Sequence, residues 1–366
     1  MEHPIDELIP YIDVEQIVID RDFSFELIDE PSKILVLLHY YLNDRSKIEL
    51  EPLTLKIGDI SNLKVEKLSN GRLLILDTSR DTLFEYDIAD HSYEIVADFG
   101  RGPGELQHSM DLTVAGDTVF VARRDMRLSR FICSASCKYD RTAVLDVQPL
   151  SIITTNSGLA VSTGLLFGLE DLYSDSGIEF SAINIFDVDS EQILYSFGEV
   201  YNSNYIQVLE RFARTGMVAF LPGNNNYIWA SSWFPYIYLY DENFEIDKVY
   251  KLDHHIQNKF TFFPTEQRLS FPGMDRTLIN TIKPIGEEKL LLVTDTRTKD
   301  QQLEVDTNYS IDYYLIDHLN RESFHIGSDQ FTSNDQKLVY ITDDELILNK
   351  NGDLFRIVNL NNIEIF

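Results

Sequence analysis

Cysteine is scarce in this sequence, which limits how the fold can be cross-linked. Only two cysteines, Cys133 and Cys137, occur in 366 residues. A zinc site built from four cysteines and a framework of several disulfides are therefore excluded. The segment ICSASCKYD separates the two by three residues, at what we expect to be a hairpin tip. A disulfide across the tip and a pair of free thiols both fit this spacing.

Long apolar runs are also missing. The longest, ILVLLHYYL at 34–42, is much shorter than the ~20 residues that a membrane-spanning helix needs. The opening segment, MEHPIDELIPYIDVE, lacks the basic-then-apolar pattern of a signal peptide. We therefore expect no membrane span. An intracellular location and export followed by removal of a leader both fit the sequence.

Basic residues are heavily outnumbered by acidic ones. The chain has 31 Lys and Arg against 60 Asp and Glu, which gives a formal net charge of -29. An acidic surface repels the phosphates of nucleic acids and of anionic lipids. Nucleic acid is therefore excluded as a partner, whereas metal ions, cationic ligands and basic protein surfaces remain compatible with the charge.

What the chain does contain is a repeat. Hydrophobic residues make up 44% of the sequence and aromatic residues 12%, enough for a sizeable core. Six segments begin at a polar or glycine-containing turn and then alternate or run apolar, as buried strands do. They are GRLLILDTS (71–79), GDTVFVARR (116–124), SGLAVSTGL (157–165), NNYIWASSW (225–233), EEKLLLVTD (287–295) and DDELILNKN (343–351).

A second run, rich in aromatic and β-branched residues, follows each of these segments. The second runs are DTLFEYD (81–87), RLSRFIC (127–133), SAINIFD (181–187), YIYLYD (236–241), DYYLID (312–317) and DLFRIV (353–358). Four of them close on an aspartate that precedes a polar turn, where a carboxylate can accept backbone N–H groups. These aspartates are Asp87, Asp187, Asp241 and Asp317. Cys133 and Val358 replace the aspartate in the other two units.

Each unit has room for four strands, and successive units lie about 40–75 residues apart, which is typical of a β-propeller. We predict an all-β fold: a six-bladed β-propeller with four-stranded antiparallel blades, with seven blades as the alternative. The propeller domain would cover 58–366. Residues 1–57 would form an N-terminal segment that partly closes the last blade, with the run at 47–58 beside 361–366. The best helical pattern, at 204–216, would be an insertion between units.

The glycine-rich stretch FGRGPGEL (99–106) connects the first unit to the second. A phosphate cradle would need a helix N-terminus after the glycines, but the sequence that follows is β-like. We therefore interpret the stretch as a corner that returns the chain from the outside of one blade to the inside of the next. Arg101 and Glu105 are expected to pair across it.

The GRGPGE loop after the first unit, preceded by a SNGRLLILD strand, resembles the six-bladed β-propeller proteins of Bacteroidetes-type bacteria. These are related to NHL-repeat and TolB-like propellers. The resemblance covers about residues 58–366 and implies a bacterial protein in the periplasm or on the cell surface. We recognise neither a leader nor a lipobox cysteine in the opening segment, and on this point our expectation departs from that pattern.

Aromatic residues gather in one part of the chain and supply the candidate binding residues. The segment WASSWFPYIY contains Trp229, Trp233, Phe234 and Tyr236, and a long insertion at 260–275 adds Phe262 and Phe263. Aromatic side chains recognise sugars, peptides and cations, although they also pack insertions onto a core. From this region we predict a contact with a protein or carbohydrate ligand.

Candidate metal ligands are few. Glu66, Asp111 and Asn280 lie on expected innermost strands, where calcium-dependent propellers hold their ion, so calcium is the one cofactor considered. His108 is the one histidine directly before an innermost strand. No catalytic residue is identified. The leading interpretation is a non-enzymatic binding module that uses the channel mouth or the aromatic region. The alternative is a metal-dependent hydrolase or lyase of the lactonase or NHL-lyase type using channel carboxylates.

Overall fold

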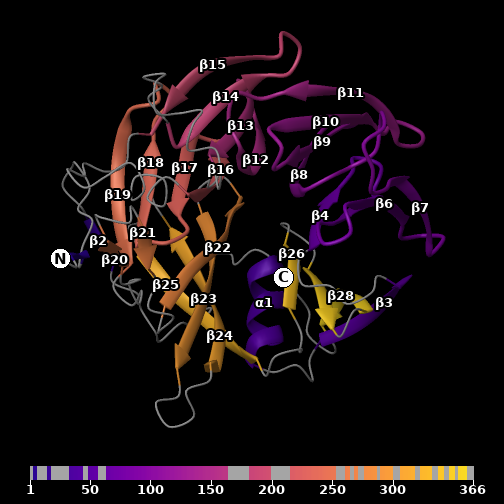
Figure 1. Cartoon of the computed structure of the whole chain (residues 1–366). Coiled ribbons are helices and arrows are strands. Elements are labelled where there is room, and N and C mark those ends of the chain that lie inside the picture. The colour runs from indigo at the N-terminus through magenta and orange to yellow at the C-terminus, as the bar shows by residue number, and fades with distance from the viewer. Residues whose placement is uncertain are drawn as a thin grey trace. The chain divides into compact units, whose positions relative to one another are not determined.

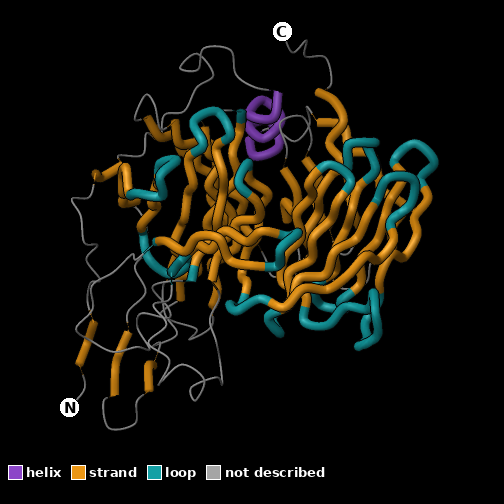
Figure 2. The backbone as a smooth tube through the Cα atoms, turned by 90° about the horizontal axis from the view of Figure 1, so that it is seen from above, coloured by secondary structure: helices purple, strands orange, loops and turns teal. Residues whose placement is uncertain are grey.

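The computed structural model describes sixteen segments of the chain. They are residues 3–5, 15–17, 33–43, 48–56, 63–163, 181–198, 215–252, 260–263, 268–270, 276–286, 289–299, 306–317, 322–331, 337–341, 346–350 and 353–360. The strands are arranged as the sheets of an all-β, six-bladed propeller with four-stranded antiparallel blades, as the sequence predicts. Figure 2 shows how completely strands dominate the described residues. The helix expected at 204–216 falls almost entirely outside them.

The chain divides into two compact units. The first comprises Met1–Arg21, Thr155–Asp187 and Ile193–Gln330, and the second Asp22–Thr154, Val188–Gln192 and Phe331–Phe366. The division falls inside the third blade, whose sheet has the order β12-β13-β14-β15. Its strands are β12 (Pro149–Thr155), β13 (Gly158–Thr163), β14 (Ile183–Asp187) and β15 (Gln192–Phe197).

The second unit holds blades 1, 2 and 6 (Figure 1). Blade 1 consists of β4 (Leu63–Lys67), β5 (Leu73–Asp77), β6 (Thr82–Asp87) and β7 (Ser92–Ala97). Blade 2 consists of β8 (Ser109–Ala115), β9 (Thr118–Arg123), β10 (Arg127–Ile132) and β11 (Lys138–Val144). Blade 6 consists of β26 (Lys337–Ile341), β27 (Leu346–Lys350), β28 (Asp353–Leu360) and β3 (Ile48–Lys56).

The first unit holds blades 4 and 5. Blade 4 consists of β16 (Gly216–Leu221), β17 (Asn226–Ser231), β18 (Tyr236–Tyr240) and β19 (Ile246–Leu252), and β2 (Glu15–Ile17) extends it as a fifth strand, parallel to β19. Blade 5 consists of β22 (Arg276–Ile285), β23 (Lys289–Lys299), β24 (Asp306–Asp317) and β25 (Glu322–Phe331). A small separate sheet joins β1 (His3–Ile5), β20 (Phe260–Phe263) and β21 (Arg268–Ser270).

The strand β3 comes from the N-terminal part of the chain and pairs antiparallel with β28 near the other end. Glu51 lies opposite Arg356, and the two side chains form an ion pair of 3.5 Å. The pairing therefore uses residues 353–360 of the last blade. The expected partner at 361–366 lies outside the described residues.

Neighbouring blades pack through apolar faces. Between blades 1 and 2, one cluster joins Leu74 and Leu83 to Val121 and Phe131, and Leu106 from the connecting loop completes it. These side chains are buried because the middle strands of each blade have neighbours on both sides and both faces. A second cluster of the same kind joins blade 6 to blade 1.

The apolar run at 34–42, which is too short to span a membrane, folds as a helix. Helix α1 (Lys33–Asn43) lies against β3, β27 and β28 of the second unit (Figure 1). Leu35, Leu38 and Tyr41 are fully buried at helical spacing. The side chain of Asn43 donates to the carbonyl of His39 in the last turn at 3.0 Å. The four leucines of the run favour a helix, and packing against the sheet offsets the weaker propensity of its β-branched and aromatic residues.

The predicted aspartate turns are confirmed in two blades. Asp87 Oδ1 accepts the N–H groups of Ala89 and Asp90 at 2.9 and 3.2 Å. Asp241 Oδ1 accepts those of Asn243 and Glu245, both at 2.9 Å. In blade 2, where the aspartate is absent, a disulfide between Cys133 and Cys137 spans the corresponding turn. Of the two alternatives that the sequence left open, a disulfide and a pair of free thiols, the structure contains the disulfide.

The stretch FGRGPGEL is a corner between β7 and β8, as predicted. The amide of Leu106 bonds to the carbonyl of Asp98 and the amide of Gly100 to the carbonyl of Leu106, both at 2.9 Å. The Glu105 carboxylate accepts the Gly102 N–H at 2.6 Å. A Cβ on Gly100 would overlap that carboxylate, so a larger residue there would have to displace the Glu105 side chain. The expected Arg101–Glu105 ion pair is not among those formed by the described residues.

Candidate functional site

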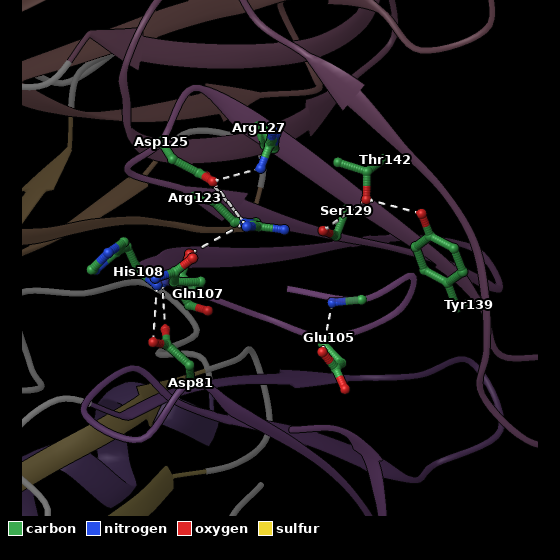
Figure 3. A network of polar contacts seen from close by, with 12 residues as sticks. Asp81, Glu105, Gln107, His108, Arg123, Asp125, Arg127, Ser129, Tyr139 and Thr142 are labelled. Carbon is green, nitrogen blue, oxygen red and sulfur yellow. Dashed lines mark hydrogen bonds and ion pairs between the residues drawn. The ribbon is translucent and has the colours of Figure 1, made fainter. Parts of the chain in front are cut away.

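A polar network of the second unit surrounds the point where the corner enters β8 (Figure 3). Asp81, in the turn between β5 and β6, is buried and accepts two backbone N–H groups, those of His108 at 2.9 Å and Ser109 at 2.6 Å. His108 has a φ of 56°, which a non-glycine residue adopts at an energetic cost. The carboxylate of blade 1 therefore fixes a strained entry into the first strand of blade 2.

Arg123 anchors the same connection from the other side. The Nε of Arg123 donates to the carbonyl of Gln107 at 3.2 Å and to Asp125 Oδ1 at 3.1 Å. The Nη2 of Arg123 donates to Asp125 Oδ2 at 2.9 Å. Arg127 adds a further bond to Asp125 at 3.1 Å. Arg123 is almost completely buried. A buried guanidinium requires this degree of satisfaction, because an unpaired one would be very costly.

His108 is exposed, and its imidazole points away from Asp81 (Figure 3). A general base of the His–Asp type needs the carboxylate at a ring nitrogen, where it orients and stabilises the imidazolium. Asp81 instead binds the main chain at 108 and 109. This geometry orders the connection and does not activate the histidine.

The first strands of blades 1, 2 and 3 are linked by a second polar group. Asp111 on β8 forms an ion pair with Lys64 on β4 at 3.2 Å. The other oxygen of Asp111 accepts the N–H of Ile152 on β12 at 2.9 Å. Both carboxylate oxygens are therefore engaged with groups of the protein. Asp111 holds three strands together across neighbouring blades.

The other two candidate calcium ligands lie on first strands of different units. Glu66 is half-buried on β4, and Asn280 is half-buried on β22. Within the described residues, no three His, Cys, Asp or Glu side chains are grouped closely enough to hold a metal ion. Nor does any helix there have the length and apolar character needed to span a membrane.

The predicted aromatic residues have different environments. Trp229 and Phe234 are fully buried, and Tyr236 is 3% exposed. Trp229 packs on Tyr238 with ring centroids 5.5 Å apart. Trp233 is only half-buried, in the turn between β17 and β18. Phe262 and Phe263 lie on β20, where Phe262 is opposite His3, and their side chains lie outside the described part.

The turn of blade 4 is organised around Ser231. Its hydroxyl accepts the amide of Phe234 at 3.2 Å and that of Trp233 at 3.4 Å. This places Phe234 inside the blade and leaves Trp233 as the most accessible of the four aromatic residues in this segment. The structure therefore brings Trp229, Phe234 and Tyr236 into the blade interior and leaves Trp233 at its edge.

Sequence reasoning missed an exposed apolar surface in blade 1, here called the rim patch: Tyr93, Ile95 and Phe99. These side chains are 47%, 57% and 63% exposed. Tyr93 and Ile95 lie on the same face of β7, the outermost strand, and Phe99 opens the corner that follows it. The alternation in SYEIVA is visible in the sequence. It resembles that of the half-buried strands and does not reveal that this strand is an edge.

The disulfide of blade 2 lies over a buried ion pair of blade 1. Glu85 on β6 pairs with Arg72, and its other oxygen accepts the Cys137 N–H at 3.2 Å. Arg72 also donates to the carbonyl of Ala135 at 2.7 Å. The loop closed by the disulfide therefore docks on charges that would otherwise be buried without enough partners.

A polar cluster on the outer strands of blade 5 contains a titrating carboxyl group. Ser328 donates to Asp312 Oδ1 at 2.5 Å, and His325 Nε2 lies 3.0 Å from the Ser328 hydroxyl and 3.5 Å from Asp312. Burial opposes ionisation of Asp312, but hydrogen bonds from His325 and Ser328 outweigh it and hold its pKa below the ordinary value. The same ring nitrogen faces both partners, which is not the arrangement of a Ser–His–Asp triad.

No protein-family model and no curated protein matches the chain. Solved structures with the same fold include a member of the DUF4221 family from Bacteroides vulgatus. It is 11% identical with a TM-score of 0.56, and the match covers 85% of this chain and 98% of that one. A Bacteroides fragilis protein described as a candidate exported protein is 14% identical with a TM-score of 0.52, covering 87% and 97%.

Virginiamycin B lyase from Staphylococcus aureus is 11% identical with a TM-score of 0.48, and the match covers 86% of this chain and 100% of the lyase. The predicted resemblance to propeller proteins of Bacteroidetes-type bacteria is thus confirmed. At these identities, the likeness to the two Bacteroides proteins concerns the fold.

Proposed function

We propose that the protein is a non-enzymatic binding module that engages a protein or carbohydrate partner through exposed side chains of its blades. The observation that carries the proposal is the rim patch, in which three large apolar side chains are about half exposed or more. Large apolar side chains that are exposed on one strand and on the corner after it favour an interaction site in a soluble protein. The likeness to a candidate exported protein supports a location outside the cytoplasm.

The polar groups near the first strands support binding over catalysis. Asp81 and Asp111 are each used to hold backbone amides, and Lys64 pairs with Asp111. A catalytic carboxylate or metal ligand needs an oxygen available to substrate or ion. These groups serve instead to fix the positions of strands.

Trp233 is the second element of the proposal. It is the accessible member of the predicted aromatic segment, and the turn that carries it is held by Ser231. A rigid aromatic side chain on an ordered turn gives contact area at low entropic cost. We assign Trp233 to a partner contact and the buried Trp229 to the stability of blade 4.

The test is a binding screen in two arms. Labelled protein is applied to a glycan array and to a random peptide library displayed on phage. We expect ligands in at least one arm, with binding reduced at least tenfold by Phe99→Ser or Trp233→Ala in folded protein. Val144→Ser, at a 67% exposed position of β11, is the control for loss of surface apolarity. No ligand in either arm would contradict the proposal.

Metal-dependent hydrolysis or lyase chemistry is tested separately. The protein is melted with and without calcium and zinc, because a specific ion stabilises the folded state by mass action. We expect the melting temperature to stay unchanged. A rise that saturates with calcium and is lost on Glu66→Gln would favour the enzyme.

A further inference from the structure

Blade 4 demonstrates that the outer edge of a blade in this protein accepts an additional strand. β2 lies parallel to β19, with Glu15, Gln16 and Ile17 opposite Tyr250, Lys251 and Leu252. An edge strand presents unpaired N–H and C=O groups, and an added strand satisfies them. On β19, Tyr250 and Leu252 lie opposite β2 and are each 4% exposed; both also belong to the apolar cluster between blades 4 and 5.

The corresponding strand of blade 1 has no such cover. β7 is the last strand of its sheet, and no strand of the described residues pairs with its outer edge. Tyr93 and Ile95 on this strand are 47% and 57% exposed. Tyr93 makes one edge-on ring contact, with Phe84 at 6.0 Å. Natural edges are usually protected by lysine, proline or a bulge along the strand. β7 has neither lysine nor proline; it has a bulge near its C-terminal end and one exposed charge, Glu94.

The outer strands of blades 2 and 3 are less suitable. On β11, Arg141 and Asp140 belong to ion pairs that involve Arg130, Asp189 and Glu191. On β15, Leu194 and Tyr195 are 46% and 52% exposed, but the Tyr195 ring already packs at a tilt against Phe244, with centroids 4.9 Å apart. Side chains already committed to neighbouring turns leave less of the strand open to a partner. β7 is therefore the best candidate edge of the three.

The charge around β7 selects the kind of partner. Three exposed carboxylates, Asp90, Glu94 and Asp98, lie on the strand and its two flanking turns. Nearby, His91 faces Glu51 at 3.9 Å, and Arg101 is exposed in the corner. The local excess is negative, as is the whole chain at -29. A second copy pairing through β7 would bring like charges together, whereas a cationic segment would be attracted.

We propose that β7 is a docking edge for an extended, cationic segment of a protein partner, which adds beside it as a fifth strand of blade 1. The segment alternates apolar residues, which cover Tyr93 and Ile95, with lysine or arginine residues that face Glu94. This inference rests on the proposed binding function and names the partner class for the rim patch. The strand pairing supplies affinity, and the alternate side chains supply selectivity.

The probe is a synthetic ten-residue peptide, acetylated and amidated, that alternates valine and lysine. Its affinity is measured by fluorescence polarisation against the full chain. Three comparison peptides are a valine–glutamate version, a block version with five valines before five lysines, and the original peptide methylated at alternate backbone nitrogens. We expect each comparison peptide to bind at least tenfold more weakly, because each removes charge attraction, alternation or strand hydrogen bonds.

On the protein side, Glu94→Lys should weaken binding at least tenfold, whereas the control Glu242→Lys, at an exposed turn position of blade 4, should leave it within twofold. Ile95→Ser tests the apolar contact, and circular dichroism verifies that each variant is folded. Equal binding of the methylated peptide, or equal effects of Glu94→Lys and Glu242→Lys, would overturn the inference. A dimer of the protein alone that Ile95→Ser dissociates would assign the edge to a second copy and overturn it too.

Failure here is separable from failure of the binding function. If the glycan or peptide screen yields ligands that respond to Trp233→Ala but not to Glu94→Lys, the binding function stands and the β7 assignment is wrong. If neither the screen nor the peptide binds, both fall.

Discussion

The carboxylate of Asp81 offers the sharpest test of how the blades are joined. It is buried and accepts the N–H groups of His108 and Ser109 at 2.9 and 2.6 Å. The substitution Asp81→Asn keeps the size of the side chain. Asparagine also tolerates the left-handed backbone conformation of residue 81, where φ is 56°. However, its amide oxygen can serve only one N–H well, and its NH2 group then faces the other.

The expected cost is about 2–3 kcal/mol, since a hydrogen bond to a charged acceptor contributes roughly 1.5–3 kcal/mol and an unsatisfied buried N–H costs about 1–3 kcal/mol. The two energies describe the same lost interaction, so they are not added together. For 366 residues that unfold together, the cost corresponds to a melting temperature lower by roughly 3–4 °C. If local opening carries the whole cost, amide exchange at 108 and 109 should accelerate by about 30-fold or more.

The assay is urea unfolding combined with hydrogen exchange resolved to these two amides. Asp90→Asn is the matched control, because it removes the same charge from an exposed turn of the same blade and should change stability by less than about 0.5 kcal/mol. If Asp81→Asn behaves like Asp90→Asn in both measurements, the carboxylate does not hold the connection and the interpretation of the network is wrong.

Two further predictions concern other closures of the fold. Replacing Cys133 and Cys137 with alanine should lower the free energy of unfolding by about 2 kcal/mol, because the disulfide restricts the entropy of the unfolded chain. A reducing agent should lower the melting temperature of the wild type to that of the variant. A wild-type melting temperature that does not change on reduction would count against this prediction. The pKa of Asp312 is lowered, so its stabilising effect is present above its unfolded value and is lost as pH falls through the folded value. The stability difference between wild type and Asp312→Asn should therefore shrink below about pH 4. A difference that grows within that acidic range would refute this sign.

The repeat was predictable because its signals are local. A run such as LLILD at 73–77 is entirely buried in the middle of blade 1, and its composition indicates this without knowledge of its neighbours. The aspartate turns at Asp87 and Asp241 follow from hydrogen bonds within five residues. In each case the sequence contains both partners of the interaction within one short segment.

The site residues were less predictable, because exposure depends on partners distant in the chain. Trp229 and Trp233 are four residues apart in one aromatic segment, yet one is fully buried and the other is not. Ser231 turns the backbone between them, and the sequence pattern does not distinguish the two sides of that turn. Helix α1 was missed for the same reason, since its apolar residues are stabilised by strands of the last blade.

The contacts between blades were beyond prediction and explain how degenerate repeats keep their order. In several blades, the turn between the third and fourth strands rests on the preceding blade through a different chemistry. The pairs are His91 with Glu51, the Cys133–Cys137 loop with Arg72 and Glu85, Glu191 with Arg141, and Phe244 with Phe197. If a turn that forms an ion pair were placed on a blade with an aromatic neighbour, its charge would have no partner. If an aromatic turn were placed on a blade with a charged neighbour, its apolar surface would be poorly buried. The backbone repeats, but each turn fits its own neighbour, so the blades cannot be exchanged without loss.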